Sequence, residues 1–286
     1  MPLFGVSPAN NHQRPHSPRA LDHVTLNIAP GEKVALCGPS GSGKTSLILT
    51  ILQMVEQSGG QIAIDDVDLS MIGGHNIRSH LNVVPQDPFF MPGTLRFNLD
   101  PHSRSSTQSV EAAIRMVGLW DKVSSSNTSN NSSSALDREL NGVEWSQGER
   151  QLLCLARALL HPSKVVILDE CTSRYAISLC ILLSFVTSYA SGVYWQANLS
   201  FHSVDEHTEA IMQNVIDTEF HDRTTISILH RFKYIDRFDR VAVLRHGRLV
   251  ECDAPQALLS RQSAFRDLYS KQNYTRASPE KEGHSG

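Results

Sequence analysis

The chain has 286 residues, 19% of them charged, and its Lys and Arg nearly balance its Asp and Glu to leave a formal net charge of -3. This length is enough for one large domain or two small ones. The balanced charge gives no indication of a nucleic-acid partner. The cysteines have neither metal-binding nor paired spacing, which favours a reducing compartment; they are Cys37, Cys154, Cys171, Cys180 and Cys252.

The start of the sequence predicts one disordered stretch and one strand. Residues 1–18 are rich in Pro, Asn and His and lack the apolar core of a signal peptide, so we expect disorder there. Residues 21–28 alternate apolar and polar side chains, which predicts a half-buried strand. Pro30-Gly31 then predicts a turn.

Residues 33–56 contain the strongest motif of the sequence. A buried strand is predicted at 34–37, followed by a glycine-rich turn and a helix that begins near Lys44 and ends at 58–60. Glycines let backbone N–H groups point at a phosphate, and the positive end of the helix attracts it. The turn fits G-x-x-x-x-G-K-[ST] with Gly38, Gly43, Lys44 and Thr45, and Gly41 lies within it. The motif indicates a nucleotide but does not by itself separate ATPases, GTPases and kinases.

The middle of the chain combines strands, loops and one helix. Residues 61–69 predict a strand with a turn at Asp65-Asp66, and residues 108–120 have helical spacing. Gln86 follows a strand, and alone it would be an ordinary loop residue. Residues 124–134 are polar and of low complexity, which predicts a flexible surface loop.

Residues 145–160 begin with WSQGE and continue as an amphipathic helix, for which Ser146 can serve as the N-cap. A helix N-terminus that carries a serine and a glycine, here Ser146 and Gly148, can bind phosphate. A plain capped helix is the simpler interpretation, and the segment taken alone favours it.

Two further buried strands end in side chains that suit phosphate chemistry. Residues 165–168 are all apolar and lead into Asp169-Glu170, and acids at such a strand end suit Mg²⁺ binding and water activation. Residues 225–229 lead into His230. A hairpin about His246-Gly247 and a helical tail at 255–269 complete the predicted elements.

These motifs stand in one order along residues 20–270, and that order resembles the nucleotide-binding domain of ATP-binding cassette (ABC) proteins, in particular the second cassette of the multidrug-resistance-protein-like subfamily C. The resemblance implies an α/β P-loop NTPase fold with an antiparallel β layer. It places a helical subdomain at about 89–160 inside a nucleotide-binding domain at 19–271, with a polar tail at 272–286. The matching motifs are Walker A at 38–45, the Q-loop glutamine Gln86, the signature at 145–149, Walker B at 165–170 and the switch histidine His230.

The resemblance also implies a mechanism. Two such domains sandwich two ATP molecules head to tail, each site combining one domain's Walker A with the other's signature, and hydrolysis drives solute export through positioning and electrostatics. The catalytic set would be Gln86, Glu170, which polarises the attacking water, and His230, which contacts the γ-phosphate. Mg²⁺ would be held by Thr45, Gln86 and Asp169. ATP would be bound by Gly38, Pro39, Ser40, Gly41, Ser42, Gly43, Lys44, Thr45 and Ser46, and by Ser146 and Gly148.

The implied partners are a second nucleotide-binding domain and the transmembrane domains of a transporter, without nucleic acid. The chain has no transmembrane set of its own, so we expect it at the cytoplasmic face of a membrane through partner membrane domains. Two alternatives remain open. One is a catalytically impaired ATP-binding fragment of a broken or mis-spliced gene, and the other is a soluble ABC ATPase that acts outside transport.

The signature departs from the family pattern. Trp145, Gln147 and Glu149 stand where the family usually has Leu, Gly and Gln. A carboxylate near the γ-phosphate on a partner domain is expected to weaken that composite site, because like charges repel. Subfamily C transporters often pair one competent site with one degenerate site, so the departure does not exclude the resemblance.

Residues 174–202 interrupt the pattern, because family members follow Walker B closely with a D-loop. From Tyr175 to Phe201 the stretch has no charged residue. A transmembrane helix is disfavoured by its many Ser, Thr and Asn residues, and a surface insertion would expose a large apolar patch. We favour a retained intron translated in frame, because codons permitted at Arg174-Tyr175 and His202-Ser203 can contain splice sites. With the stretch present, we expect weak ATP binding, poor hydrolysis and poor dimerisation.

Overall fold

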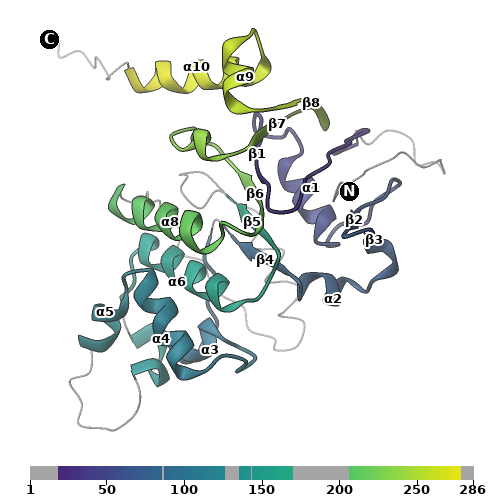
Figure 1. The fold of residues 1–286 in the computed structure, drawn as a ribbon. Helices are drawn as coiled ribbons and strands as arrows, with labels where there is room; N and C mark the ends of the chain where they lie inside the picture. Colours follow the sequence, from purple (N-terminus) through teal and green to yellow (C-terminus); the bar gives the residue numbers. More distant parts are fainter. Residues whose placement is uncertain (1–18, 86, 126–134, 143, 170–205, 278–286) are drawn as a thin grey trace, which may run out of the picture. The chain divides into compact units, whose positions relative to one another are not determined.

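The structure, a computed structural model, describes residues 19–85, 87–125, 135–142, 144–169 and 206–277 (Figure 1). The chain divides into two compact units, one formed by residues 1–77 and 226–286 and the other by residues 78–225. The predictions for 1–18, for most of 124–134, for 174–202 and for 278–286 lie outside the described residues. Among the described residues, no helix combines the length and apolar character needed to cross a bilayer.

The first unit is built on the strands β1 (Lys33–Cys37), β7 (Arg240–Arg245) and β8 (Arg248–Asp253). β1 pairs parallel with β7, and β7 pairs antiparallel with β8. β6 (Thr224–Ile228) lies next to β1 in the strand order and crosses the division between the units. β1 is wholly apolar after its first residue because both of its faces are covered, which is typical of a parallel strand.

Helices cover this strand layer. One face of β1 and β7 packs against η4 (Ile235–Arg237), α9 (Pro255–Ser260) and α10 (Ala264–Ala277) in a cluster of aliphatic and aromatic side chains. Ala35 and Cys37 of β1 belong to this cluster, and Val34 and Leu36 do not, as the two-residue period of a strand requires. α1 (Lys44–Ile51) follows β1. The same unit contains β2 (Ala63–Ile64), β3 (Val67–Asp68), η1 (Leu69–Met71) and most of α2 (Gly74–Arg78).

The second unit combines the parallel strands β4 (Leu81–Val84) and β5 (Val165–Asp169) with a helical layer. Its central helix is α6 (Gln147–Leu160), which contacts three neighbouring helices, α3 (Leu95–Leu99), α4 (Thr107–Met116) and α8 (Glu206–Glu219) (Figure 1). One apolar core joins these elements, because each helix turns its apolar face inward. The remaining elements are α5 (Trp120–Ser125), η2 (Ala135–Asp137) and η3 (Leu140–Gly142).

Most predicted elements are confirmed. β1, α6, β5 and the hairpin of β7 and β8 lie where the sequence predicts them. The turn at Asp65-Asp66 is also confirmed: both residues have positive φ, 49° and 63°, which is the backbone of a two-residue hairpin turn.

The prediction of a strand at 21–28 is wrong. Val24, Leu26 and Ile28 are buried and the residues between them are exposed, as a strand would require, but no strand is formed there. Alternation reports which side chains are buried, whereas a strand also needs a neighbouring backbone in register.

Three predicted helices have different bounds. The helix predicted over 108–120 divides into α4 and α5 because Gly118, with a φ of 73°, closes α4 through bonds from Gly118 N to Arg115 O and from Leu119 N to Ile114 O. The tail predicted over 255–269 divides into α9 and α10, and Ser263 Oγ accepts from Arg266 N at the start of α10. α1 ends at Ile51, before the predicted position.

Candidate functional site

The phosphate loop, residues 38–45, joins β1 to α1, and its glycines are fixed by the backbone around it. Gly38 has a φ of 150°, and a Cβ on it would lie 2.3 Å from Leu244 O. Gly43 has a φ of 103°, and its Cβ would lie 2.8 Å from Ala20 O. Gly41 has a φ of 75° but faces open space. The first two positions therefore exclude any side chain, whereas Gly41 is required only for its backbone conformation.

The start of α1 is available to an anion. Its N-cap is Gly43, which provides no side-chain acceptor, and the first turn has no acidic residue. The first N–H groups of a helix have no partner within the helix, and the helix dipole adds positive potential at that end. A phosphate group would satisfy both.

Lys44 is only 6% exposed, and its ammonium group folds back over the loop. Lys44 Nζ donates to Gly38 O at 2.8 Å and to Pro39 O at 3.1 Å. Burial raises the pKa of the neighbouring Cys37 thiol to about 12, against the lowering effect of Lys44, so this thiol stays neutral. The charge of Lys44 therefore strengthens the attraction of the loop for an anionic ligand.

Ser42 gives a second indication of a ligand. Its hydroxyl oxygen is buried and has no hydrogen-bond partner among the described atoms. A buried polar atom without a partner costs free energy, and such atoms are rare in native proteins. A phosphate oxygen in the loop would supply the missing partner.

Two segments distant in sequence support the loop from outside. Gly247 N, at the turn between β7 and β8, donates to Ser42 O at 3.0 Å, and Asp22 N donates to Gly247 O at 2.8 Å. The Arg248 guanidinium contacts Asp22 Oδ2 at 2.6 Å. The sequence predicts the turn at Gly247 but carries no signal that it touches the phosphate loop.

Other predicted residues of this unit surround the loop in the chain. Pro39 and Ser40 are exposed, whereas Thr45 and Ser46 are half-buried on α1. Ser46 O accepts from Thr50 Oγ1 at 2.7 Å within the helix. The loop and the first turn of α1 thus offer hydroxyl groups as well as amides.

His230, which follows β6, is held by the C-terminal helix α10. Gln272 Nε2 donates to His230 O, and Phe232 N donates to Gln272 Oε1 at 2.9 Å. Phe232 also stacks on Tyr269 of α10, with 6.1 Å between the ring centroids. One amide side chain therefore fixes the main chain on both sides of Arg231, a role that the sequence does not indicate.

The second unit contains Asp169 and the signature segment, residues 145–149. Asp169 is the last residue of β5 and is buried. Ser146 caps α6: its Oγ accepts from Glu149 N at 3.1 Å, and Glu149 Oε2 accepts from Ser146 N at 2.7 Å. This capping box confirms the predicted N-cap. A Cβ on Gly148 would lie 3.0 Å from the Thr208 side chain, so α6 and α8 approach closely there.

The predicted site residues are therefore only partly brought together. The phosphate-loop residues and His230 lie in the first unit, whereas Asp169, Ser146 and Gly148 lie in the second. Gln86 and Glu170 lie outside the described residues. Their shared role in one site stays a prediction.

Comparison with known proteins agrees with the motifs. The family model described as ABC transporter matches residues 21–173. The chain is 39% identical to ABC multidrug transporter B of Aspergillus fumigatus over 90% of its length, 36% identical to metal resistance protein YCF1 of Saccharomyces cerevisiae over 91%, and 35% identical to ATP-binding cassette sub-family C member 2 of Rattus norvegicus over 92%. It spans 15% of each of these proteins.

A solved structure agrees with the fold. The structure of a bacterial Atm1-family ABC exporter with ATP bound matches with a TM-score of 0.73 and 24% identity, over 98% of this chain and 43% of that one. At this identity the likeness supports the fold of the cassette alone.

Proposed function

Because this chain belongs to the ABC transporter family as a nucleotide-binding domain, we propose that it hydrolyses ATP to drive solute export. Members of this family are ATPases, and their nucleotide is ATP. The observation that carries the proposal is the phosphate loop, residues 38–45, which contains buried Lys44, a Ser42 hydroxyl without a hydrogen-bond partner among the described atoms, and a helix start without a side-chain cap. The alternatives of an impaired fragment or a non-transport ATPase are not favoured, since the matching family model is described as ABC transporter and one relative is named as a multidrug transporter.

Each predicted residue has a role in this proposal. Lys44 and the loop of residues 38–46 hold the phosphates through backbone N–H groups, which every residue of the loop except Pro39 can supply. Ser146 and Gly148 contact the ATP on a second cassette. Thr45, Gln86 and Asp169 offer the oxygen donors that Mg²⁺ prefers. When bound, Mg²⁺ would neutralise charge on the phosphates. Glu170 polarises the attacking water, and His230 contacts the γ-phosphate.

We further propose two partners, a second nucleotide-binding domain and transmembrane domains that place the cassette at the cytoplasmic face of a membrane. Two relatives are named for multidrug transport and metal resistance. Because the chain spans only a small share of these relatives, membrane domains would belong to the remainder of such a transporter. In this proposal the membrane domains bind the solute and determine its class.

Nucleotide binding is tested first, by titrating the full chain with a fluorescent ATP analogue. Lys44→Ala should weaken binding by at least about tenfold, as expected when one charge-assisted contact to phosphate is lost. Lys164→Ala, at an exposed lysine in the second unit, is the matched control and should leave binding unchanged. Equal affinity of the parent and Lys44→Ala would contradict the assignment of the loop.

Hydrolysis is tested separately, in single-turnover experiments with Mg²⁺ and radiolabelled ATP. Glu170→Gln should abolish product formation while it leaves nucleotide binding intact, because it removes the carboxylate that polarises the water. If the parent chain binds ATP and releases product no faster than Glu170→Gln, the chain is an impaired nucleotide binder. A second parent lacking residues 174–202 shows whether that stretch is the cause.

A further inference from the structure

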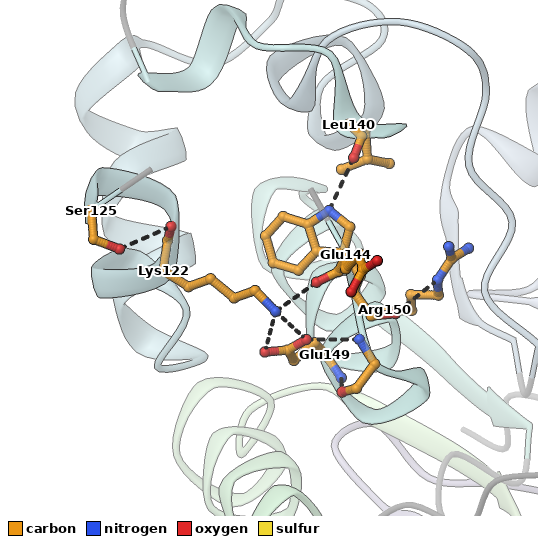
Figure 2. A network of polar contacts seen from close by, with 8 residues as sticks. Lys122, Ser125, Leu140, Glu144, Glu149 and Arg150 are labelled. Carbon is orange, nitrogen blue, oxygen red and sulfur yellow. Dashed lines mark hydrogen bonds and ion pairs between the residues drawn. The ribbon is translucent and has the colours of Figure 1, made fainter. Parts of the chain in front are cut away.

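Residues that depart from the family signature are connected to one another. Trp145 and Glu149 both contact Lys122, which lies on α5 and is separated from Glu149 by 27 positions in the sequence (Figure 2). Figure 2 shows the lysine side chain extending from α5 to the start of α6, where its ammonium group ends beside the Glu149 carboxylate. Two of the three departures, Trp145 and Glu149, therefore form one structural unit with Lys122.

The Glu149 carboxylate is fully engaged within this unit. Both of its oxygens accept from Lys122 Nζ, at 2.8 and 2.7 Å, and Oε2 also accepts from Ser146 N at 2.7 Å. Burial raises the pKa of this carboxyl, but the Lys122 ammonium and the Ser146 amide outweigh it and hold the pKa below the usual range. Glu149 is thus ionised near neutral pH, and its charge is directed at two donors of its own chain.

Lys122 is fixed from two further sides. Its ammonium donates to Glu144 O at 2.7 Å and lies 5.1 Å from the centroid of the Trp145 ring. Trp145 is held in turn, because its indole N–H donates to Leu140 O at 3.1 Å. The tryptophan supplies a flat, electron-rich surface for the cation, which a leucine at this position would not.

The charges of the unit balance. The substitution of Gln by Glu in the signature adds one negative charge, and Lys122 adds one positive charge at salt-bridge distance, 2.7 Å. The side chains of Lys122 and Glu149 are 35% and 24% exposed, so solvent screens the pair incompletely. The charges of Lys122 and Glu149 sum to zero, so the pair does not repel an anion near the start of α6. The positive end of the α6 dipole can still attract that anion.

We propose that Lys122 is a positioning residue that acts through Glu149 and keeps the signature segment competent to contact the γ-phosphate of ATP on a second cassette. The inference rests on the proposed function and concerns the same composite site. It replaces the expectation that the carboxylate weakens the site: the segment WSQGE is a signature whose added charge is compensated by α5.

The experiment compares four forms of the full chain: the unchanged parent, Lys122→Met, Glu149→Gln and the variant that combines both substitutions. Methionine keeps most of the length of the lysine stem and removes the charge. Arg115→Met is the matched control, because the Arg115 guanidinium also lies over a tryptophan, 4.0 Å from the Trp120 centroid. Urea unfolding verifies that every variant is folded.

Two readouts separate the inference from the proposed function. Titration with a fluorescent ATP analogue measures binding to the phosphate loop, which all forms should share. Sedimentation velocity with Mg²⁺ and a non-hydrolysable ATP analogue measures association of each form with a second copy of itself. Lys122→Met should weaken this association roughly tenfold, about 1.4 kcal/mol, because the Glu149 charge is then uncompensated.

The double variant decides between compensation and a purely structural contact. If Lys122 acts by compensating charge, the double variant should associate with an affinity within about threefold of the parent. If the Lys122–Glu149 contact only stabilises the structure, the double variant should associate as weakly as Lys122→Met. Lys122→Arg keeps the positive charge and replaces Lys122→Met in the experiment if Lys122→Met does not fold. A tenfold weaker association of Lys122→Arg would overturn the inference.

The failures are distinguishable. A parent chain that binds nucleotide but shows no nucleotide-dependent association, either with residues 174–202 or without them, overturns the competence of the signature and leaves nucleotide binding intact. A parent chain that binds no nucleotide overturns the proposed function and the inference with it.

Discussion

Two glycines of the phosphate loop should respond differently to the same substitution. In Gly38→Ala the added methyl group would lie 2.3 Å from the backbone oxygen of Leu244 and 2.7 Å from Ser42 Oγ, at a φ of 150°. Backbone on the adjacent strand β7 cannot move without disturbing its ladder with β1. Gly41→Ala adds the same methyl group at a φ of 75° but into open space.

The magnitudes follow from these surroundings. Gly41→Ala lowers the free energy of unfolding by about 1–2 kcal/mol, because an alanine must then adopt the left-handed backbone conformation. Gly38→Ala adds overpacking of about 1–3 kcal/mol to backbone strain of about 1–3 kcal/mol. The middle values of these ranges, about 4 kcal/mol for Gly38→Ala and about 1.5 kcal/mol for Gly41→Ala, differ by about 2.5 kcal/mol, a large fraction of a typical domain stability of about 5–15 kcal/mol.

Urea unfolding followed by tryptophan fluorescence and far-UV circular dichroism measures this difference, and titration with a fluorescent ATP analogue measures the loop itself. Gly38→Ala should unfold at clearly lower urea and lose nucleotide binding. Gly41→Ala should unfold near the parent and lose only part of its affinity. Equal unfolding midpoints and equal affinities for the two variants would refute the argument from close approach.

Three further results are expected. Gln272→Ala should lower the rate of ATP hydrolysis more than it weakens ATP binding, because it frees the main chain at His230; unchanged single-turnover rates would contradict this. Ser146→Ala should cost about 1 kcal/mol of unfolding free energy through the lost cap, and Ser146→Asp, which can still cap, should retain most of it. Burial raises the pKa of Glu32, but the hydrogen bonds from Arg240 and the Ala29 amide outweigh it and hold the pKa below its usual range. Its contribution to stability is therefore present above the ordinary pKa of a glutamate, about 4.3, and is lost as the pH falls through its lowered value. Glu32→Gln should be less sensitive to acid than the parent in urea unfolding below that pH; an identical acid response would exclude this role.

The sequence alone determined the elements whose signals are local. The phosphate loop is a run of consecutive residues whose glycines and lysine set its turn directly. The cap of α6 is likewise an exchange between Ser146 and Glu149, three positions apart. Such contacts form within one turn of chain, so spacing is enough to predict them. The family resemblance rests on the same local motifs.

Tertiary structure decided what depends on contacts between distant segments. Residues 21–28 have the pattern of a strand but form none, so periodicity misled the prediction. Gln272 reaches back to His230 across 42 positions, and Lys122 reaches Glu149 across 27. Neither pair has a sequence signal, because which polar side chains meet depends on how helices pack and not on their spacing along the chain. For the same reason, the signature segment alone could not predict that the Lys122 ammonium of α5 lies 2.7 Å from the Glu149 carboxylate.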